Sequence, residues 1–297
     1  MIEAVNEVSV MEVKAFTFKG VGGNPAGVVL NADQYSQEQK QEIARLAEYA
    51  ETAFVSHSQI ADRKLEFFTP NRQIAHCGHA TVATFSYLSQ SNELNKRYAT
   101  KETIDGTRDI ILQDGMAFME QKPQFYTELD DDEVLAVMTS LSLNLADLKP
   151  GYRPMVSNTG NSFIVIPLKN NLILQAINTD LDAINRISEK FNLVGFYAFT
   201  TDAVEPDHDI SARMFAPLYA IPEESATGMA AGSLAAYLFD HMNFKVPQIV
   251  IEQGYFMTPA SKSEIIVNLI VEEEKLTQIM AGGRANVGKV KKVKLLF

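Results

Sequence analysis

Two helical segments without a single charged residue constrain the fold of this chain more than any other feature. Residues 77–88 read CGHATVATFSYL, and residues 226–238 read ATGMAAGSLAAYL. A helix on the surface keeps a polar face in water, so such segments belong in an interior that covers them on all sides. We therefore expect each helix to be wrapped by a β-sheet of its own.

The two segments also belong to a weak internal repeat. Each follows a strand that ends in Phe-x-Pro, then an irregular loop and a glycine, Gly78 or Gly228. From these glycines the copies align without a gap, so that Tyr87 pairs with Tyr237. Strands and helices alternate in both halves of the chain. Self-similarity of this kind indicates a duplicated domain.

The predicted division between the copies falls in residues 123–134, PQFYTELDDDEV, where a proline accompanies a run of acids. We expect an α+β protein with two pseudo-symmetric domains, residues 1–125 and 126–297. Each would be a rolled sheet or barrel around its central helix. A C-terminal tail, about residues 286–297, is expected to pack back on the first domain.

Other helix starts are marked by capping residues. Ser36 precedes a helical pattern and has Gln39 three residues later, the spacing of a capping box. Thr179 or Asp180 precedes a second helical pattern at residues 181–192. These helices contain charged residues, and we expect them on the surface.

Composition excludes several classes of function. The 297 residues carry a net charge of -11, which repels a polyanion, so we expect no nucleic-acid partner. No apolar run approaches the ~18 residues that span a bilayer, so we expect no membrane partner. The first ten residues, MIEAVNEVSV, lack the basic and apolar pattern of a signal peptide. A cytoplasmic location is the simplest expectation.

Cofactor motifs are missing as well. The single cysteine excludes an intramolecular disulfide and a multi-cysteine metal site. The loop GVGGN lacks the spacing of a nucleotide-binding glycine loop. Asp207, His208 and Asp209 are interpreted as a turn and not as metal ligands. We expect neither a nucleotide cofactor nor a metal site of these kinds.

The starts of the two uncharged helices suggest a binding site. The first four N–H groups of a helix have no partner within the helix, and the dipole adds about half a positive charge there. A carboxylate fits such an end, and a preceding glycine lets it approach the backbone. Two such ends facing each other across a cleft would bind a small anion. The alternative is that both are only well-packed core helices.

Two titratable residues near the first helix start are candidates for proton transfer. His79 is expected to be the first helical residue, either as a ligand contact or relay or as a packing residue, with a neutral ring because of the helix dipole. Glu51 lies between the end of a predicted helix and the start of a predicted strand and has apolar neighbours. We expect its pKa to be raised. Its alternative interpretation is a solvent-exposed carboxylate.

Three further residues have two interpretations each. Glu223 and Glu224 precede the second helix, where acids also simply favour the dipole. Cys77 precedes the first helix and is by default a small buried hydrophobe. A helix N-terminus lowers the pKa of a thiol, which leaves a reactive role open.

The segments GNPAGVVL, ETAFV, FFTPNRQIAHCGHAT and RMFAP…EESATGMAAGSLAAYL resemble the PhzF-like family, named for a phenazine biosynthesis isomerase. The resemblance covers most of the chain in the right order. It implies the diaminopimelate epimerase-like fold, with the active site in a cleft between two domains. It also implies that no metal or organic cofactor is needed and that the protein is a homodimer.

Site residues follow from the same resemblance. It makes Glu51 the acid/base and puts His79 against the substrate, with Glu224 as a third catalytic residue. The residues it implies for substrate binding lie in the first glycine loop and at the two helix starts: Asn24, Gly78, Ala80, Thr227, Gly228 and Met229.

The second motif departs from the family pattern, which usually reads Glu-Asp-Pro-Ala-Thr-Gly-Ser. Glu224 replaces the aspartate, Ser225 the proline and Met229 the serine, while Ala220 stands where glycine is usual. The missing aspartate and serine argue against the phenazine substrate. Ser225 also occupies the place of the second cysteine of the epimerases, which disfavours racemisation by two thiols.

The sequence therefore predicts a cofactor-independent isomerase that moves a proton between carbons of a small carboxylated metabolite through Glu51. One alternative is a non-catalytic binding or regulatory protein on the same fold. Another is an amino-acid racemase or epimerase that uses Glu51 with Cys77.

Overall fold

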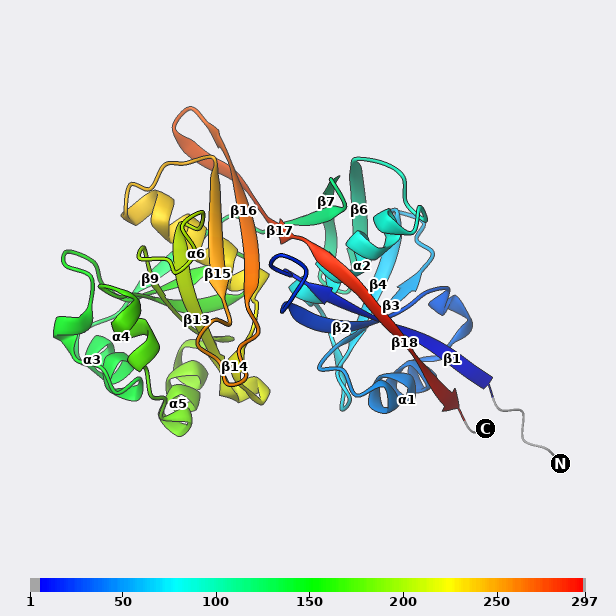
Figure 1. The fold of residues 1–297 in the computed structure, drawn as a ribbon, viewed down its shortest axis with the longest axis horizontal. Helices are drawn as coiled ribbons and strands as arrows, with labels where there is room; N and C mark the ends of the chain where they lie inside the picture. The colour runs from blue at the N-terminus through cyan, green and yellow to red at the C-terminus, as the bar shows by residue number, and fades with distance from the viewer. Residues whose placement is uncertain (1–5, 296–297) are drawn as a thin grey trace. The chain divides into compact units, whose positions relative to one another are not determined.

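The computed structural model describes residues 6–295, which divide into two compact units. The first consists of Met1–Glu120 with Gly282–Phe297, and the second is Gln121–Ala281 (Figure 1). The predicted division after residue 125 falls within β9 (Phe125–Glu128), which belongs wholly to the second unit and pairs with β10 (Met155–Asn158). Residues 1–5, 296 and 297, which belong to the predicted N-terminal domain and C-terminal tail, lie outside the described part.

The first unit is a sheet around a central helix. Its strands are β1 (Asn6–Ala15), β2 (Asn24–Val29), β3 (Thr52–Ser56), β4 (Arg63–Phe68), β5 (Gln73–Ile74), β6 (Tyr98–Thr103), β7 (Gly106–Gln113), β8 (Met116–Glu120) and β18 (Ala285–Leu295). The helix α2 (Gly78–Gln90) packs against β1, β2, β3, β7, β8 and β18. Residues 78–86 of α2 are all buried, which confirms the prediction for this uncharged segment.

The C-terminal strand closes this sheet. β18 runs antiparallel to β1, with Val8 opposite Val293. On the other face of the sheet lies α1 (Gln37–Ala47), whose Ile43 and Ala44 pack with Val10 and Phe54 in one apolar cluster. The capping box at the start of α1 is present as predicted.

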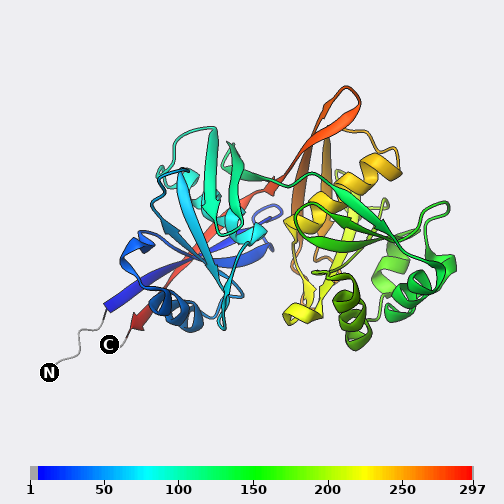
Figure 2. The same cartoon turned by 180° about the vertical axis from the view of Figure 1, so that it is seen from behind.

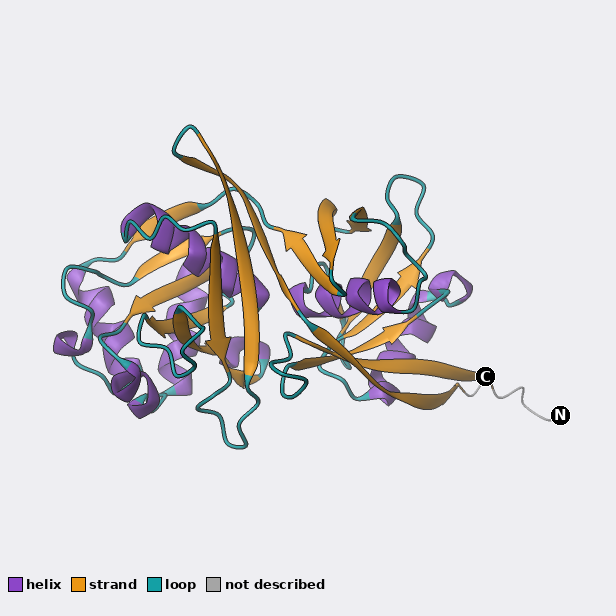
Figure 3. Ribbon diagram, turned by 45° about the horizontal axis from the view of Figure 1, so that its top comes forward, coloured by secondary structure: helices purple, strands orange, loops and turns teal. Residues whose placement is uncertain are grey.

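The second unit repeats this plan. Its remaining strands are β11 (Ser162–Pro167), β12 (Gly195–Thr200), β13 (Ile210–Ala216), β14 (Ile221–Glu224), β15 (Gln248–Gln253), β16 (Ser263–Glu272) and β17 (Lys275–Gly283). The central helix α6 (Gly228–His241) packs against β10, β11 and β16 (Figures 2 and 3). Its residues 228–239 are all buried. The outer helices are α3 (Asp131–Ser140), α4 (Asn171–Ala176) and α5 (Leu181–Phe191). Asp180 caps α5, which decides between the two residues predicted there.

Strand pairing shows the duplication directly. In the first unit β2 runs parallel to β3, β3 antiparallel to β4, β4 parallel to β6, and β6 antiparallel to β7. In the second unit β11, β12, β13, β15 and β16 repeat the same sequence of directions. In each unit a short strand and then the buried helix follow the third strand of this series. The predicted α+β fold with two pseudo-symmetric halves is confirmed.

Candidate active site

The two central helices differ from the others at their starts. The N-cap residues of α1, α3, α4 and α5 each accept a backbone N–H with a side-chain oxygen. Cys77 before α2 and Thr227 before α6 make no such bond. Within residues 6–295, no protein oxygen accepts from the backbone N–H of Gly78, Ala80, Gly228 or Met229. Both helix starts therefore keep donors available for an anionic ligand.

Three side chains gather at the start of α2. Cys77 is its N-cap and His79 its second residue, because the helix begins at Gly78, one residue earlier than predicted. His79 Nδ1 lies 3.5 Å from Cys77 Sγ, and His79 Nε2 lies 3.3 Å from Glu51 Oε2. The second contact is an ion pair and not a well-aligned hydrogen bond. Glu51 immediately precedes β3, and its carbonyl accepts from the N–H of Gly27 in β2 at 3.0 Å.

The protonation states of Glu51 and His79 differ from those predicted. Burial lowers the pKa of His79, but the Cys77 sulfur and the Glu51 carboxylate raise it well above its ordinary value. Burial raises the pKa of Glu51, but the contact with His79 and its charge bring it below its ordinary value. The predictions of a neutral His79 and a raised pKa for Glu51 are therefore wrong. At neutral pH Glu51 is a carboxylate and His79 an imidazolium.

A buried lysine lies behind this group and was not predicted. Lys101 in β6 is fully buried, donates to Thr81 Oγ1 at 2.9 Å and has its Nζ 3.2 Å from His76 Nδ1. Burial and the charge of Arg108 lower the pKa of Lys101 to about 7, although the Cys77 sulfur acts in the opposite direction. Alternation in a strand gives no signal for a buried lysine, so the sequence alone could not identify it.

The start of α6 is held by a polar network within the second unit. Thr227 Oγ1 donates to the Glu224 carboxylate, and the Thr227 N–H donates to Gln253 Oε1 at 3.1 Å. Tyr197 also donates to Gln253 Oε1, at 3.0 Å. Gln253 Nε2 donates to the Glu224 carbonyl at 2.7 Å. Glu224 and Thr227 thus contact each other directly, whereas Gln253 and Tyr197 had no sequence signal.

Glu223 has a different environment from Glu224. Arg213 clamps it in bidentate fashion, with Nε 2.9 Å from Oε1 and Nη2 2.8 Å from Oε2. The same guanidinium donates to the carbonyls of Leu174 and Ile177 near the end of α4. Such a pair fixes β14 against the outer helix. This arrangement favours a structural role for Glu223.

The other predicted binding residues lie at these helix starts or beside them. Ala80 is fully buried in the first turn of α2, and Met229 is buried in the first turn of α6. The Gly228 carbonyl accepts from the buried side chain of Gln121 at 2.8 Å. Asn24 begins β2, three residues before Gly27 and buried like it.

One group in the described part of the chain offers metal ligands. One ligand atom each from Glu51, Cys77 and His79 lies within 4.8 Å of the others. The segment 207–209, by contrast, is a turn as predicted, and His208 in it is buried against two glutamates.

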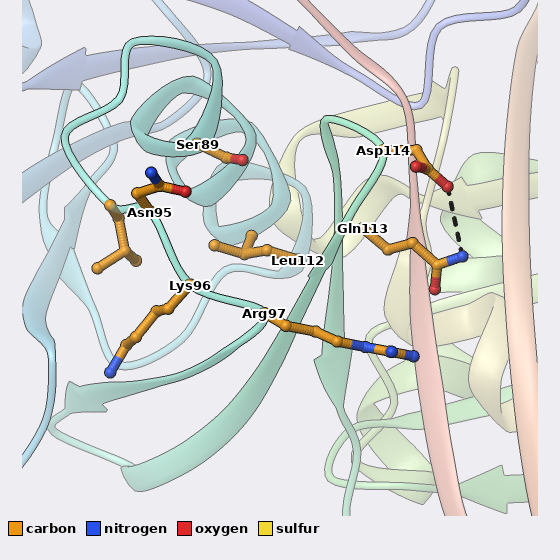
Figure 4. A pocket seen from close by; sticks show the side chains of 8 residues that line it. Ser89, Asn95, Lys96, Arg97, Leu112, Gln113 and Asp114 are labelled. Carbon is orange, nitrogen blue, oxygen red and sulfur yellow. Dashed lines mark hydrogen bonds between the residues drawn. The ribbon is translucent and has the colours of Figure 1, made fainter.

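A hollow of about 410 Å³ lies elsewhere in the first unit. Ser89, Lys96, Arg97, Gln113 and Asp114 line it, as Figure 4 shows. Ser89 is ten residues along α2 from His79, which places it about 15 Å along the helix axis. This hollow is therefore separate from the residues at the start of α2.

Sequence comparison decides the family. The profile of the PhzC-PhzF family, described as phenazine biosynthesis-like protein, matches residues 13–288. The chain belongs to this family. It is 35% identical over 237 residues to the uncharacterized isomerase YddE of Escherichia coli K12, covering 78% of this chain and 79% of the relative. It is 26% identical to a trans-2,3-dihydro-3-hydroxyanthranilate isomerase of Pseudomonas chlororaphis, covering 82% and 84%.

Solved structures agree with this family and its fold. The phenazine biosynthesis protein of the PhzF family from Bacillus anthracis matches with a TM-score of 0.86 at 26% identity, covering 97% of this chain and 99% of that one. A hydroxyproline epimerase from Agrobacterium vitis shares the fold, with a TM-score of 0.60 at 13% identity and coverage of 100% and 95%. The PhzF-family protein described above is thus an isomerase with the diaminopimelate epimerase-like fold. Its described residues include no helix long and apolar enough to cross a membrane.

Proposed function

We propose that this PhzF-family isomerase moves a proton between carbons of a small carboxylated metabolite, with Glu51 as the base and then the acid. One observation carries the proposal. Glu51 is a carboxylate with only 13% of its side chain exposed, paired with His79 at the open start of a buried helix. A general base must be ionised and enclosed near the carbon that it deprotonates.

The His79 imidazolium gives Glu51 its resting charge. The pair lowers the pKa of Glu51, so the carboxylate is ready to accept a proton. When Glu51 takes the proton from carbon, its attraction to His79 weakens, and the imidazolium can donate to the negative oxygen that develops on the substrate. The protonated Glu51 then returns its proton to a different carbon. Atoms and charge balance without a further reactant.

The open backbone amides support the class of substrate. The N–H groups of Gly78 and Ala80 have no protein acceptor in residues 6–295, and the helix dipole favours negative charge beside them. A carboxylate or an enolate oxygen matches such donors. In the second unit, Gly228 and Met229 offer the same kind of donor, while Thr227 and Glu224 form a second candidate proton carrier.

The substitution Glu51→Gln tests the proposal, with solvent deuterium exchange into carbon followed by NMR. One probe is trans-2,3-dihydro-3-hydroxyanthranilate, the compound in the name of the Pseudomonas chlororaphis relative. The others are a panel of small carboxylated metabolites. We expect exchange to fall at least about 100-fold, the usual size of a general acid–base contribution. The matched control is Glu48→Gln, because Glu48 caps the preceding helix and pairs with Lys291 on the surface.

Three results would contradict the proposal. Exchange that is unchanged in the Glu51 variant would remove Glu51 from the reaction. Binding of a carboxylated probe with no exchange at any pH would instead indicate a non-catalytic binding protein. Equal losses in the Glu51 and Glu48 variants would point to damage to the fold and would also count against a specific role.

A further inference from the structure

The cluster at the start of α2 has the composition of a metal site. It offers a thiol, an imidazole and a carboxylate from Cys77, His79 and Glu51, with one ligand atom of each within 4.8 Å of the others. Two of these residues share the first turn of a helix, and the third immediately precedes the strand β3, which contacts that helix. The ligand atoms are thus fixed by regular structure on both sides.

We propose that Cys77, His79 and Glu51 bind a thiophilic divalent cation of the Zn²⁺ class, which reversibly blocks the isomerase. Sulfur and imidazole nitrogen together select such ions over Mg²⁺ or Ca²⁺, and three protein ligands leave a fourth tetrahedral position open. The isomerase would be inhibited because the ion coordinates the Glu51 carboxylate, which would otherwise move the proton. That consequence rests on the proposed function, whereas the binding itself does not.

The spacing of the sulfur and the nitrogen fits tetrahedral coordination. Zinc bonds of about 2.3 Å to sulfur and about 2.0–2.1 Å to nitrogen place the two ligand atoms about 3.6 Å apart. Cys77 Sγ and His79 Nδ1 are already 3.5 Å apart. A single ion takes only one nitrogen of the imidazole, so the Glu51 carboxylate has to turn toward Nδ1 from its present contact with Nε2. One ligand atom of each residue lies within 4.8 Å of the others, a limit wider than the separation of about 3.6 Å between neighbouring tetrahedral ligands, so the side chains have to close around the ion.

Charge decides the strength of binding. The start of α2 and the Lys101 ammonium near Cys77 both disfavour a cation. The ion must therefore be neutralised by two anionic ligands, the Cys77 thiolate and the Glu51 carboxylate. The ion binds the deprotonated sulfur and the neutral imidazole, so any protons on these ligands pass to solvent, and no other reactant is needed.

The single cysteine makes the site visible by spectroscopy. Titration of the full chain with Cd²⁺ is expected to produce one ultraviolet thiolate-to-metal band per chain, and this band can come only from Cys77. Zn²⁺ should abolish the band by competition, and Mg²⁺ should leave it unchanged. The substitution Cys77→Ser should remove the band entirely.

The other two ligands are tested separately. His79→Gln and Glu51→Gln should each weaken Cd²⁺ binding at least about 10-fold, in the range seen when the surroundings of a metal are altered. The matched controls are His57→Gln and Glu48→Gln, both at exposed positions, and both should bind as the parent does. Circular dichroism identifies any variant that fails to fold, and the two remaining ligand variants then decide the question.

The outcomes separate this inference from the proposed function. The absence of a band, or a band of unchanged affinity in both His79→Gln and Glu51→Gln, overturns the metal site even if the metal-free protein catalyses exchange. A band with the expected losses supports the site even if no exchange is found. Zn²⁺ that binds one equivalent but leaves exchange intact overturns the block.

Discussion

His208 provides a test of the electrostatics of the second unit. Its side chain is 1% exposed, with Nδ1 3.1 Å from Glu252 Oε2 and Nε2 3.2 Å from Glu264 Oε2. Both ring nitrogens can donate only when the imidazole is protonated. Burial lowers the pKa of His208, but the two glutamates outweigh it and raise the pKa to about 9. The substitution His208→Gln removes the positive charge of the imidazolium and leaves the Glu252 and Glu264 carboxylates without this partner.

The magnitude follows from the change in pKa. A rise from 6.5 to about 9 corresponds to about 3 kcal/mol, at about 1.36 kcal/mol for each pH unit. Because the pKa is raised in the folded state, this stabilisation is fully present below about pH 6.5 and is lost as the pH rises through about 9. The difference in unfolding free energy between parent and variant should therefore shrink by about 3 kcal/mol over this range.

Urea unfolding at about pH 6 and about pH 9.5 measures this difference. Comparison of parent and variant at each pH cancels the titration of all other groups that they share. His57→Gln is the control, because His57 is exposed and its loss should cost little at either pH. A difference between parent and His208→Gln that is equal at the two pH values would refute the proposed ion pairs.

Two further predictions concern backbone strain and the buried lysine. Ala220 is exposed and left-handed, with φ of 60°, so Ala220→Gly should raise the unfolding free energy by about 0.5–1 kcal/mol, whereas the control Ala260→Gly in an exposed loop should lower it slightly. Lys101→Met should stabilise the protein at pH 6 by about 4 kcal/mol, since a pKa lowered from 10.5 to about 7 costs about 5 kcal/mol and the lost hydrogen bond to Thr81 offsets about 1. This gain should fade as the pH rises from about 7 and disappear above about 10.5, the ordinary pKa, where the lysine is neutral in both states. Urea unfolding of each variant and its parent tests both predictions, and a gain for Lys101→Met that does not change with pH contradicts the second.

Patterns that act over a few residues were readable from the sequence. The lack of charge in residues 78–88 and 228–238 predicted two buried helices, and both are buried. The capping box at Ser36 was likewise visible, because its partners are three residues apart. Such signals depend on helix geometry alone, and the rest of the chain does not alter them.

Charge states could not be predicted in the same way. The position of Glu51 between apolar neighbours suggested a raised pKa, and the helix dipole suggested a neutral His79. Each argument considered one residue, but the two side chains lie 3.3 Å apart although they are 28 positions apart in sequence. Lys101 and Gln253 were missed for the same reason, because only the folded sheet brings them to a helix start.

The two halves of the duplication now differ at their helix starts. In the second unit, Gln253 already accepts the N–H of the N-cap residue Thr227, and Thr227 binds the Glu224 carboxylate. In the first unit, the N-cap residue is Cys77. In the described part of the chain, its sulfur has one hydrogen-bond contact, which is with the charged ring of His79. The hydrogen-bond network in the second unit is satisfied within the protein, so it can position a ligand, but a change of charge in it costs free energy. The thiol, imidazolium and carboxylate in the first unit are groups that exchange protons readily. Duplication thus supplied two open helix starts, and the residues around them favour proton transfer at the first.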